Sequence, residues 1–180
     1  IALSLVGSEM CIRDSGIIGL PNAGKSSLLA SMTSATPKIA NYKFTTLNPN
    51  LGVAVYDDKE ITLADIPGLI EGAHSGVGLG IKFLKHIERC KTLLHLIDIN
   101  EEDLVSSYKQ VRNELKSYGK ELIKKKEIIV FNKIDLLQKN NIDKKVKDFE
   151  IKIKKKTFKM STIQSKSVSN IKSKLISYVS

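Results

Sequence analysis

The octapeptide Gly-Leu-Pro-Asn-Ala-Gly-Lys-Ser at residues 19–26 constrains the fold of this 180-residue chain more than any other feature. It follows a short apolar run, residues 16–18, and leads into a segment, residues 27–32, that is typical of a helix. Glycine lets a loop wrap closely, so that successive backbone N–H groups point inward at an anion. The pattern therefore predicts a strand, a phosphate-binding loop and a helix, in that order.

The side chains of this loop fit the chemistry of a nucleoside triphosphate. The Lys25 ammonium can reach the β- and γ-phosphates, and the Ser26 hydroxyl can ligate Mg²⁺. A chance glycine turn at a strand–helix junction is the alternative, which the complete pattern in this context disfavours. We predict that the whole loop contacts nucleotide: Gly19, Leu20, Pro21, Asn22, Ala23, Gly24, Lys25 and Ser26.

A second candidate segment follows a predicted β-hairpin. Residues 51–56 and 60–65 are β-rich runs that a short turn joins. The second run ends in Asp65, Ile66, Pro67 and Gly68. A carboxylate at a strand end near a phosphate loop can hold Mg²⁺ through water, and a glycine N–H can approach a γ-phosphate closely. The glycine-rich residues 69–80 are predicted to be mobile until a ligand orders them.

The tetrapeptide Asn132-Lys133-Ile134-Asp135 indicates which base is bound. It follows residues 127–131, an apolar run typical of a buried strand. The Asp135 carboxylate can accept hydrogen bonds from N1–H and N2–H₂ of guanine, whereas adenine offers no such pair of donors. The Lys133 stem can lie over the base plane, and Asn132 can either bind base atoms or brace the phosphate loop. The sequence therefore predicts a guanine site.

The remaining elements complete an α/β pattern. Residues 92–98 form a continuous apolar strand in which His95 is predicted to be a core histidine, and residues 100–118 form an amphipathic helix. After the last predicted strand come Ser161, Thr162 and Ile163, at the edge where open sheets bind ligands. We predict a P-loop NTPase three-layer sandwich: a mostly parallel six-stranded sheet with one antiparallel edge strand and helices on both faces.

The charge of the chain leaves two interpretations open. Lysine and arginine number 29 against 19 acidic residues, a net charge of +10. Such an excess favours a polyanionic partner such as RNA, but it can also reflect compositional bias, and the lysine-rich residues 140–156 are predicted to be a solvated helix face. Two distant cysteines form no disulfide or metal framework. No run approaches the ~20 apolar residues of a membrane span, so we expect no membrane partner. We also expect a monomer and, with so few cysteines, a reducing cytoplasmic compartment.

Taken together, the motifs resemble those of the Obg family of translation-associated GTPases. The similarity covers residues 14–180 and includes the phosphate loop, residues 42–52, residues 65–73 and residues 78–90. The resemblance implies that Thr46 joins Ser26 on Mg²⁺ when GTP is bound. It also implies a segment that lies over the nucleotide: Phe44, Thr45, Thr46, Leu47 and Asn48.

The same resemblance implies the remaining roles. Residues 65–68 face Mg²⁺ and the γ-phosphate, residues 132–135 bind guanine, and residues 161–163 contact the base from its other side. Thr162 stands where the family usually has alanine, and Leu69 stands where many GTPases carry a water-orienting glutamine. An apolar side chain cannot orient water, so hydrolysis is expected to be slow without another group, a K⁺ ion held near Asn22, or a partner such as the ribosome.

The implied function is a slow switch that hydrolyses GTP to GDP and phosphate and acts in assembly of the large ribosomal subunit. Two alternatives stay open: a nucleotide-dependent RNA- or ribosome-binding module with incidental hydrolysis, and an ATP-using relative. Residues 1–13 interrupt the expected pattern, so we expect a foreign segment from a sequencing or cloning join, or a poorly ordered extension. Obg proteins also carry a glycine-rich N-terminal domain and often a C-terminal domain, so the chain is interpreted as a truncated G domain.

Overall fold

The computed structural model describes residues 15–33, 38–39, 50–65, 88, 90–119 and 121–179. The strands are β1 Ser15–Ile18, β2 Lys38–Ile39, β3 Asn50–Tyr56, β4 Lys59–Asp65, β5 Thr92–Asp98, β6 Lys126–Asn132 and β7 Thr157–Lys159. The helices are α1 Lys25–Met32, α3 Leu104–Tyr118, α4 Lys139–Ile153 and α5 Ser165–Val179, with short 3₁₀ turns η1 Leu122–Lys124 and η2 Ile134–Leu136.

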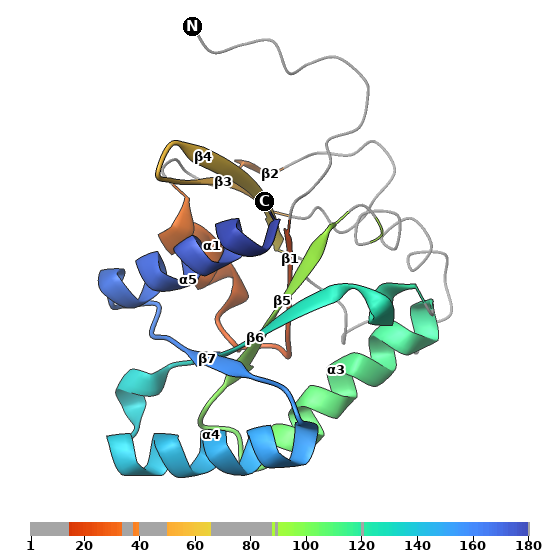
Figure 1. Cartoon of the computed structure of the whole chain (residues 1–180), viewed down its shortest axis with the longest axis vertical. Coiled ribbons are helices and arrows are strands. Elements are labelled where there is room, and N and C mark those ends of the chain that lie inside the picture. Colours follow the sequence, from red (N-terminus) through yellow and green to blue (C-terminus); the bar gives the residue numbers. More distant parts are fainter. Residues whose placement is uncertain are drawn as a thin grey trace, which may run out of the picture.

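One sheet runs through the molecule, in the order β2-β3-β4-β1-β5-β6-β7 (Figure 1). Strands β4, β1, β5, β6 and β7 are parallel, and β3 is antiparallel to β4. The predicted fold class is confirmed. The sequence did not predict β2, which adds two residues beyond β3, so that β3 is not at the edge. Two residues are too few to show an alternating pattern in sequence.

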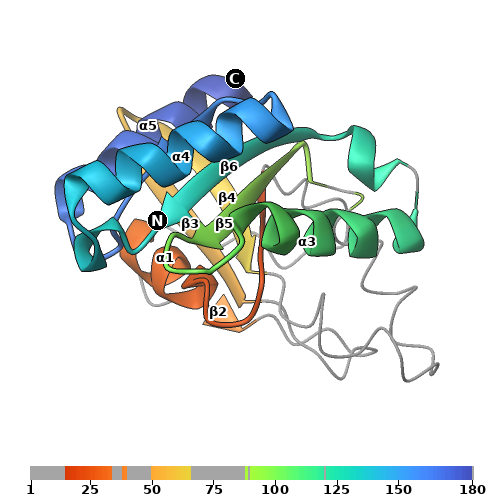
Figure 2. The same ribbon diagram turned by 90° about the horizontal axis from the view of Figure 1, so that it is seen from below.

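Helices cover both faces of the sheet (Figure 2). One face packs against α1 and α5 through a core that includes Leu28, Met32 and Leu175. The other face packs against α3 and α4, where Phe131 of β6 contacts Phe149 of α4 edge-on at 5.0 Å between ring centroids. Burial on both faces explains why β5 and β6 read as unbroken apolar runs. Within the described residues, no helix has the length and apolar character to cross a bilayer.

Two helix ends differ from their predicted positions for local reasons. Helix α3 begins at Leu104 rather than residue 100, because the Asp103 carboxylate accepts hydrogen bonds from the N–H groups of Val105 and Ser106 at 2.9 and 3.1 Å. Helix α4 ends at Ile153, where Lys154 turns into the left-handed region with φ 57°. The predicted helix over 81–90, the loop 69–80 and the leader 1–13 fall largely or wholly outside the described residues.

The β3–β4 hairpin closes through a two-residue turn. Asp57 and Asp58 both have positive φ, 51° and 58°, and the flanking residues Tyr56 and Lys59 pair directly. Two consecutive positive φ values define the type I′ turn, whose twist matches that of the strands it joins. The predicted turn was one residue longer, since Lys59 is the first residue of β4.

His95 is a buried residue of β5, as predicted. It is fully buried, and its Nδ1 lies 2.9 Å from Glu127 Oε1, while its Nε2 has no hydrogen-bond partner in the part of the chain described. Glu127 also accepts hydrogen bonds from Tyr108 Oη at 3.0 Å and Lys155 Nζ at 2.7 Å. Burial alone would raise the pKa of Glu127, but bonding to His95 and Lys155 and the charge of Arg112 lower it to about 2.

Candidate functional site

The glycine loop lies between β1 and α1, pressed against the ends of other strands. Gly19 has φ 154°, and a Cβ built there would lie 2.3 Å from the carbonyl oxygen of Leu96 in β5. No side chain fits at that distance. The first glycine of the pattern is therefore required by close packing of the loop on the sheet.

The loop turns inward through two more positive φ angles. Asn22 has φ 63° and Gly24 has φ 95°, and α1 starts at the next residue, Lys25. Lys25 Nζ donates to the carbonyl oxygens of Gly19 at 3.0 Å and Leu20 at 2.9 Å. The ammonium therefore lies against the first turn of the loop, at the N-terminus of α1, where backbone geometry favours an anion.

Ser26 and Asp65 meet next to this loop. Ser26 Oγ donates a hydrogen bond to Asp65 Oδ2 at 2.6 Å, joining the first turn of α1 to the end of β4. Asp65 is 1% exposed, and its other oxygen, Oδ1, is buried with no hydrogen-bond partner in the described chain. A buried carboxylate oxygen without a donor is unfavourable unless a cation or water completes it. Hydroxyl and carboxylate oxygens are the donors that Mg²⁺ prefers.

Asn132 connects the two predicted motifs. Its buried Nδ2 donates to the carbonyl oxygen of Ala23 at 3.0 Å, across 109 residues of sequence. A Cβ built on Gly24 would lie 2.5 Å from the same nitrogen. Of the two roles that the sequence left open for Asn132, the structure shows the brace on the loop. The glycine at position 24 leaves room for that amide.

Lys133 is held beside β5. Its backbone is left-handed with φ 62°, and its Nζ lies 2.7 Å from Oδ2 of Asp98, the last residue of β5. Burial alone would raise the pKa of Asp98, but hydrogen bonds from Lys133 and Asn100 hold it below its usual range. Asp98 was not among the predicted site residues. An acidic residue at the end of a buried strand was the available signal.

Asp135 lies against the segment that follows β7. Ser161 is fully buried, and its Oγ donates to Asp135 Oδ1. The backbone joins the same two loops, since Ile134 N–H donates to the Met160 carbonyl oxygen at 3.3 Å. Thr162 is half-buried and Ile163 is 78% exposed. The predicted base-binding residues 132–135 and 161–163 are therefore adjacent in space.

Two groups of predicted site residues lie outside the described residues. They are Phe44, Thr45, Thr46, Leu47 and Asn48, together with Ile66, Pro67 and Gly68. Their roles stay predictions, including that of Thr46 at Mg²⁺.

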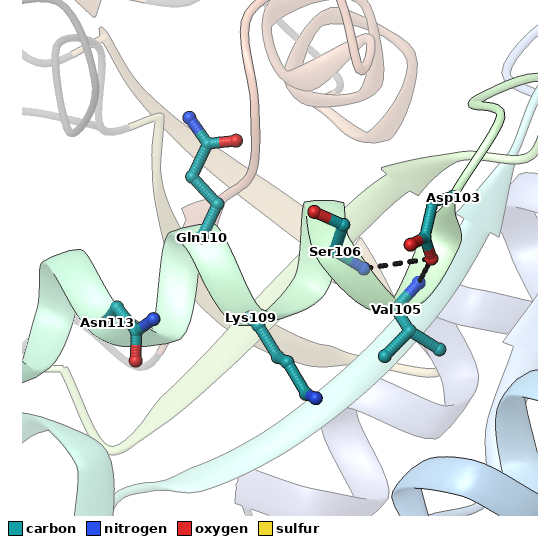
Figure 3. Close-up of a pocket in the computed structure, with 6 residues that line it drawn as sticks. All are labelled: Asp103, Val105, Ser106, Lys109, Gln110 and Asn113. Atoms are coloured by element: carbon teal, nitrogen blue, oxygen red, sulfur yellow. Dashed lines mark hydrogen bonds between the residues drawn. The ribbon is translucent and has the colours of Figure 1, made fainter.

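A shallow hollow elsewhere on the surface contains no predicted site residue. It runs along α3 and is lined by Asp103, Val105, Ser106, Lys109, Gln110 and Asn113. Figure 3 shows that Gln110 and Lys109 project in different directions from the helix rather than converging on one point. A hollow lined by one helix, without converging polar groups, lacks the form of a small-molecule site.

A glycine loop between β1 and α1, with a basic and a hydroxyl residue at the helix start, defines the class of P-loop nucleotide-binding folds. The family model described as "50S ribosome-binding GTPase" matches residues 14–133. The chain belongs to this family.

Similar proteins confirm the resemblance to Obg. GTPase Obg of Pelagibacter ubique (strain HTCC1062) is 69% identical over 169 residues, which are 94% of this chain and 52% of that protein. GTPase Obg of Ehrlichia chaffeensis (strain ATCC CRL-10679 / Arkansas) is 57% identical over 168 residues, 93% of this chain and 49% of that protein. The chain thus spans about half the length of these relatives.

Among solved structures, a single-residue variant of Era from Aquifex aeolicus, bound to GDP and AlF4⁻, superposes with a TM-score of 0.66. Its sequence is 25% identical, and the match covers 92% of this chain and 55% of that one.

Proposed function

We propose that the chain binds guanine nucleotide and hydrolyses GTP to GDP and phosphate with Mg²⁺. The observation that carries the proposal is the hydrogen bond from Asn132 Nδ2 to the Ala23 carbonyl oxygen. This bond joins residues 132–135, the candidate base-binding loop, to residues 19–26, the candidate phosphate loop. The two loops are therefore next to each other. Support also comes from the family match and from the Obg relatives.

In this proposal each loop has a separate task. The backbone N–H groups of residues 19–26 and the Lys25 ammonium bind the phosphates. The Asp135 carboxylate, oriented by Ser161, accepts the two guanine hydrogen bonds, and the Lys133 stem, oriented by Asp98, lies along the base. Such a site rejects adenine, which offers no matching pair of donors and would leave the carboxylate unpaired.

The residues around Ser26 fit a magnesium ion. Ser26 Oγ would be a direct ligand, as predicted, and the orphaned Asp65 Oδ1 would hold the ion through water. When bound, the ion supplies charge neutralisation at the phosphate oxygens during transfer. Thr46 is the second proposed ligand, on the basis of the Obg resemblance.

We expect hydrolysis by the chain alone to be slow. Leu69 stands where a water-orienting glutamine is common, and an apolar side chain does not orient water. A K⁺ ion near Asn22, or the large ribosomal subunit, is proposed to complete the site. Asn22 is exposed at the rim of the loop, where such an ion can be reached from solvent.

The proposed cellular role is assembly of the large ribosomal subunit, by a cytoplasmic monomer. The family description and the Obg relatives support the ribosomal partner. The alternative, an RNA- or ribosome-binding module with incidental hydrolysis, is favoured by the net charge of +10.

The test measures phosphate release from GTP by the purified chain in Na⁺ and in K⁺ buffer, with and without 50S subunits. Lys25→Ala is expected to abolish nucleotide binding, because it removes the ammonium that lies against the candidate phosphate loop. Competition between GTP and ATP, repeated with Asp135→Asn, measures the preference of the site for guanine over adenine. Equal affinity for ATP would overturn the proposed guanine site, and rapid turnover in Na⁺ buffer without ribosomes would overturn the proposal that hydrolysis by the chain alone is slow. Retention of 50S binding by a nucleotide-free Lys25→Ala variant would favour the binding module.

A further inference from the structure

The positive charge of the chain is concentrated in one segment. Residues 139–159, which form α4, the connecting loop and β7, contain nine lysines and three acidic residues. This segment therefore holds +6 of the net +10 charge of the whole chain. Figure 1 shows α4 as a straight helix along one outer edge of the molecule.

Three of the nine lysines have structural roles within the fold. Lys145 Nζ donates to the carbonyl oxygens of Ile99 and Glu101, each at 2.9 Å. Lys155 bonds to the buried Glu127 at 2.7 Å, and Lys159 pairs with Asp143 at 2.7 Å. The Lys145 bonds hold α4 to the loop after β5, the Lys155 bond holds the connecting loop to β6, and the Lys159 pair joins β7 to α4 within the segment.

Of the remaining six lysines, Lys139 is the first residue of α4, and its charge acts on Asp143. The other five are exposed and have neither a hydrogen bond nor an ion pair in the part of the chain described: Lys144, Lys147, Lys152, Lys154 and Lys156. We call these five residues the α4 lysine surface. Of the acidic residues in the segment, Asp143 is paired and Glu150 accepts bonds from Thr157, which leaves only Asp148 to offset them.

Folding gives no reason for this arrangement. The buried face of α4 is formed by Ile142, Val146 and Phe149, so the helix is anchored without the exposed lysines. Like charges three residues apart on a helix, such as Lys144 and Lys147, repel each other and reduce stability slightly. An external polyanion would relieve that repulsion.

We propose that the α4 lysine surface binds the phosphate backbone of double-stranded RNA. This inference rests on the proposed ribosomal function and names the surface that would carry it. From Lys144 to Lys154 the chain rises about 15 Å along the helix, a length over which a nucleic-acid duplex presents several phosphates. Lysines act as point charges on phosphates without reading bases.

The chemistry of the surface favours a nucleic-acid duplex over a single strand or a lipid surface. No aromatic residue lies among these lysines in sequence between Lys144 and Lys156 except the buried Phe149, so bases have no ring on which to stack. Ile151 is the exposed apolar side chain of α4 at 64% exposure. One such residue is too little for an amphipathic helix to insert into a lipid surface.

The test compares two variants of the whole chain with equal loss of charge. Lys147→Gln/Lys152→Gln/Lys154→Gln removes three members of the surface, and Lys59→Gln/Lys109→Gln/Lys166→Gln removes three exposed lysines elsewhere. The probe is a 20-base-pair RNA duplex, titrated at salt concentrations from 50 to 200 mM. Circular dichroism confirms that each variant is folded.

We expect the first variant to bind RNA roughly tenfold more weakly or worse at low salt, with the slope of log K against log salt reduced by about three. The control variant is expected to change the slope by less than one, and Asp148→Asn is expected to strengthen binding. Equal losses in the two triple variants would overturn the inference, as would tighter binding to anionic phospholipid vesicles than to duplex.

GTP binding and turnover without RNA, measured on the same samples, separate the two proposals. None of the substituted lysines lies in the candidate nucleotide site, so all variants are expected to keep the wild-type values. If the two triple variants lose RNA binding equally while GTP turnover stays intact, only the proposed role of the α4 lysine surface is refuted. Absence of GTP binding by the wild type, with the RNA slopes as expected, refutes only the nucleotide function.

Discussion

Replacing Gly24 by alanine tests the geometry that joins the two halves of the candidate site. The added Cβ would lie 2.5 Å from Asn132 Nδ2, whereas ordinary contact begins near 3.4 Å. The amide must therefore retreat by about 0.9 Å, which breaks its 3.0 Å hydrogen bond to Ala23. A lost buried hydrogen bond costs about 1–3 kcal/mol, and alanine at φ 95° adds about 1–2 kcal/mol of strain.

The combined penalty of about 2–5 kcal/mol falls on the conformation of the loop that is competent to bind phosphate. It corresponds to a roughly 30-fold to several-thousandfold loss of GDP affinity, measured by equilibrium titration with a fluorescent GDP analogue. Gly119→Ala is the matched control: its φ is 173°, an extended conformation open to any residue, and no atom of the described residues lies within 4 Å of the built Cβ. We expect the control to leave affinity and stability within about 0.5 kcal/mol of wild type.

A double-mutant cycle isolates the clash from the strain. In an Asn132→Ala background the amide is absent, so Gly24→Ala should cost only the backbone strain. The coupling free energy between the two positions is then about 1–3 kcal/mol. Coupling below about 0.5 kcal/mol would show that Asn132 does not act on the loop through this contact.

Three further perturbations test other features. Asp98→Asn is expected to lower GDP affinity about two- to tenfold with little change in melting temperature, because it releases Lys133 at 2.7 Å; an unchanged dissociation constant would contradict the assigned orientation. Glu127→Gln should lower the free energy of unfolding at pH 7 by about 3 kcal/mol, from the pKa fall of 4.5 to about 2. Since the folded-state pKa is depressed, this stabilisation is present above pH 4.5 and is lost as the pH falls toward 2, so urea unfolding should show variant and wild type converging there. Asp57→Asn with Asp58→Gly should raise stability by about 0.5–1 kcal/mol in thermal unfolding, because both residues occupy left-handed turn positions; a fall would show that the turn is not type I′.

The contiguous parts of the site could be predicted from sequence because each motif carries its own geometry. Residues 19–26 specify a loop by their glycines, and residues 132–135 follow a strand whose apolar run is unmistakable. The links between motifs could not be predicted. The Asn132–Ala23 bond spans 109 residues, and the pairings of Asp98 with Lys133 and of Ser161 with Asp135 depend on strand order in the sheet.

The ends of the helices also differed from the predicted ones, because they depend on single local contacts or backbone angles that the sequence pattern does not specify. The start of α3 depends on which of several polar residues caps it, and Asp103 prevails by bonding two N–H groups. The end of α4 depends on one backbone angle at Lys154, a lysine in a run of lysines that carries no turn signal. Gly119 does end α3, through its N–H bond to Leu115, but in an extended conformation that needs no glycine.

The bond from Asn132 to Ala23 also has a kinetic consequence. Asn132 is the last residue of β6, whose neighbour β7 is a three-residue strand at the edge of the sheet. Edge elements open more readily than the centre of a sheet, and local opening proceeds in contiguous units. When β7 frays and the end of β6 opens, the Asn132 amide moves away from the glycine loop. The lifetime of a bound phosphate would therefore depend partly on the fraying of β7, a strand that does not contact the phosphate.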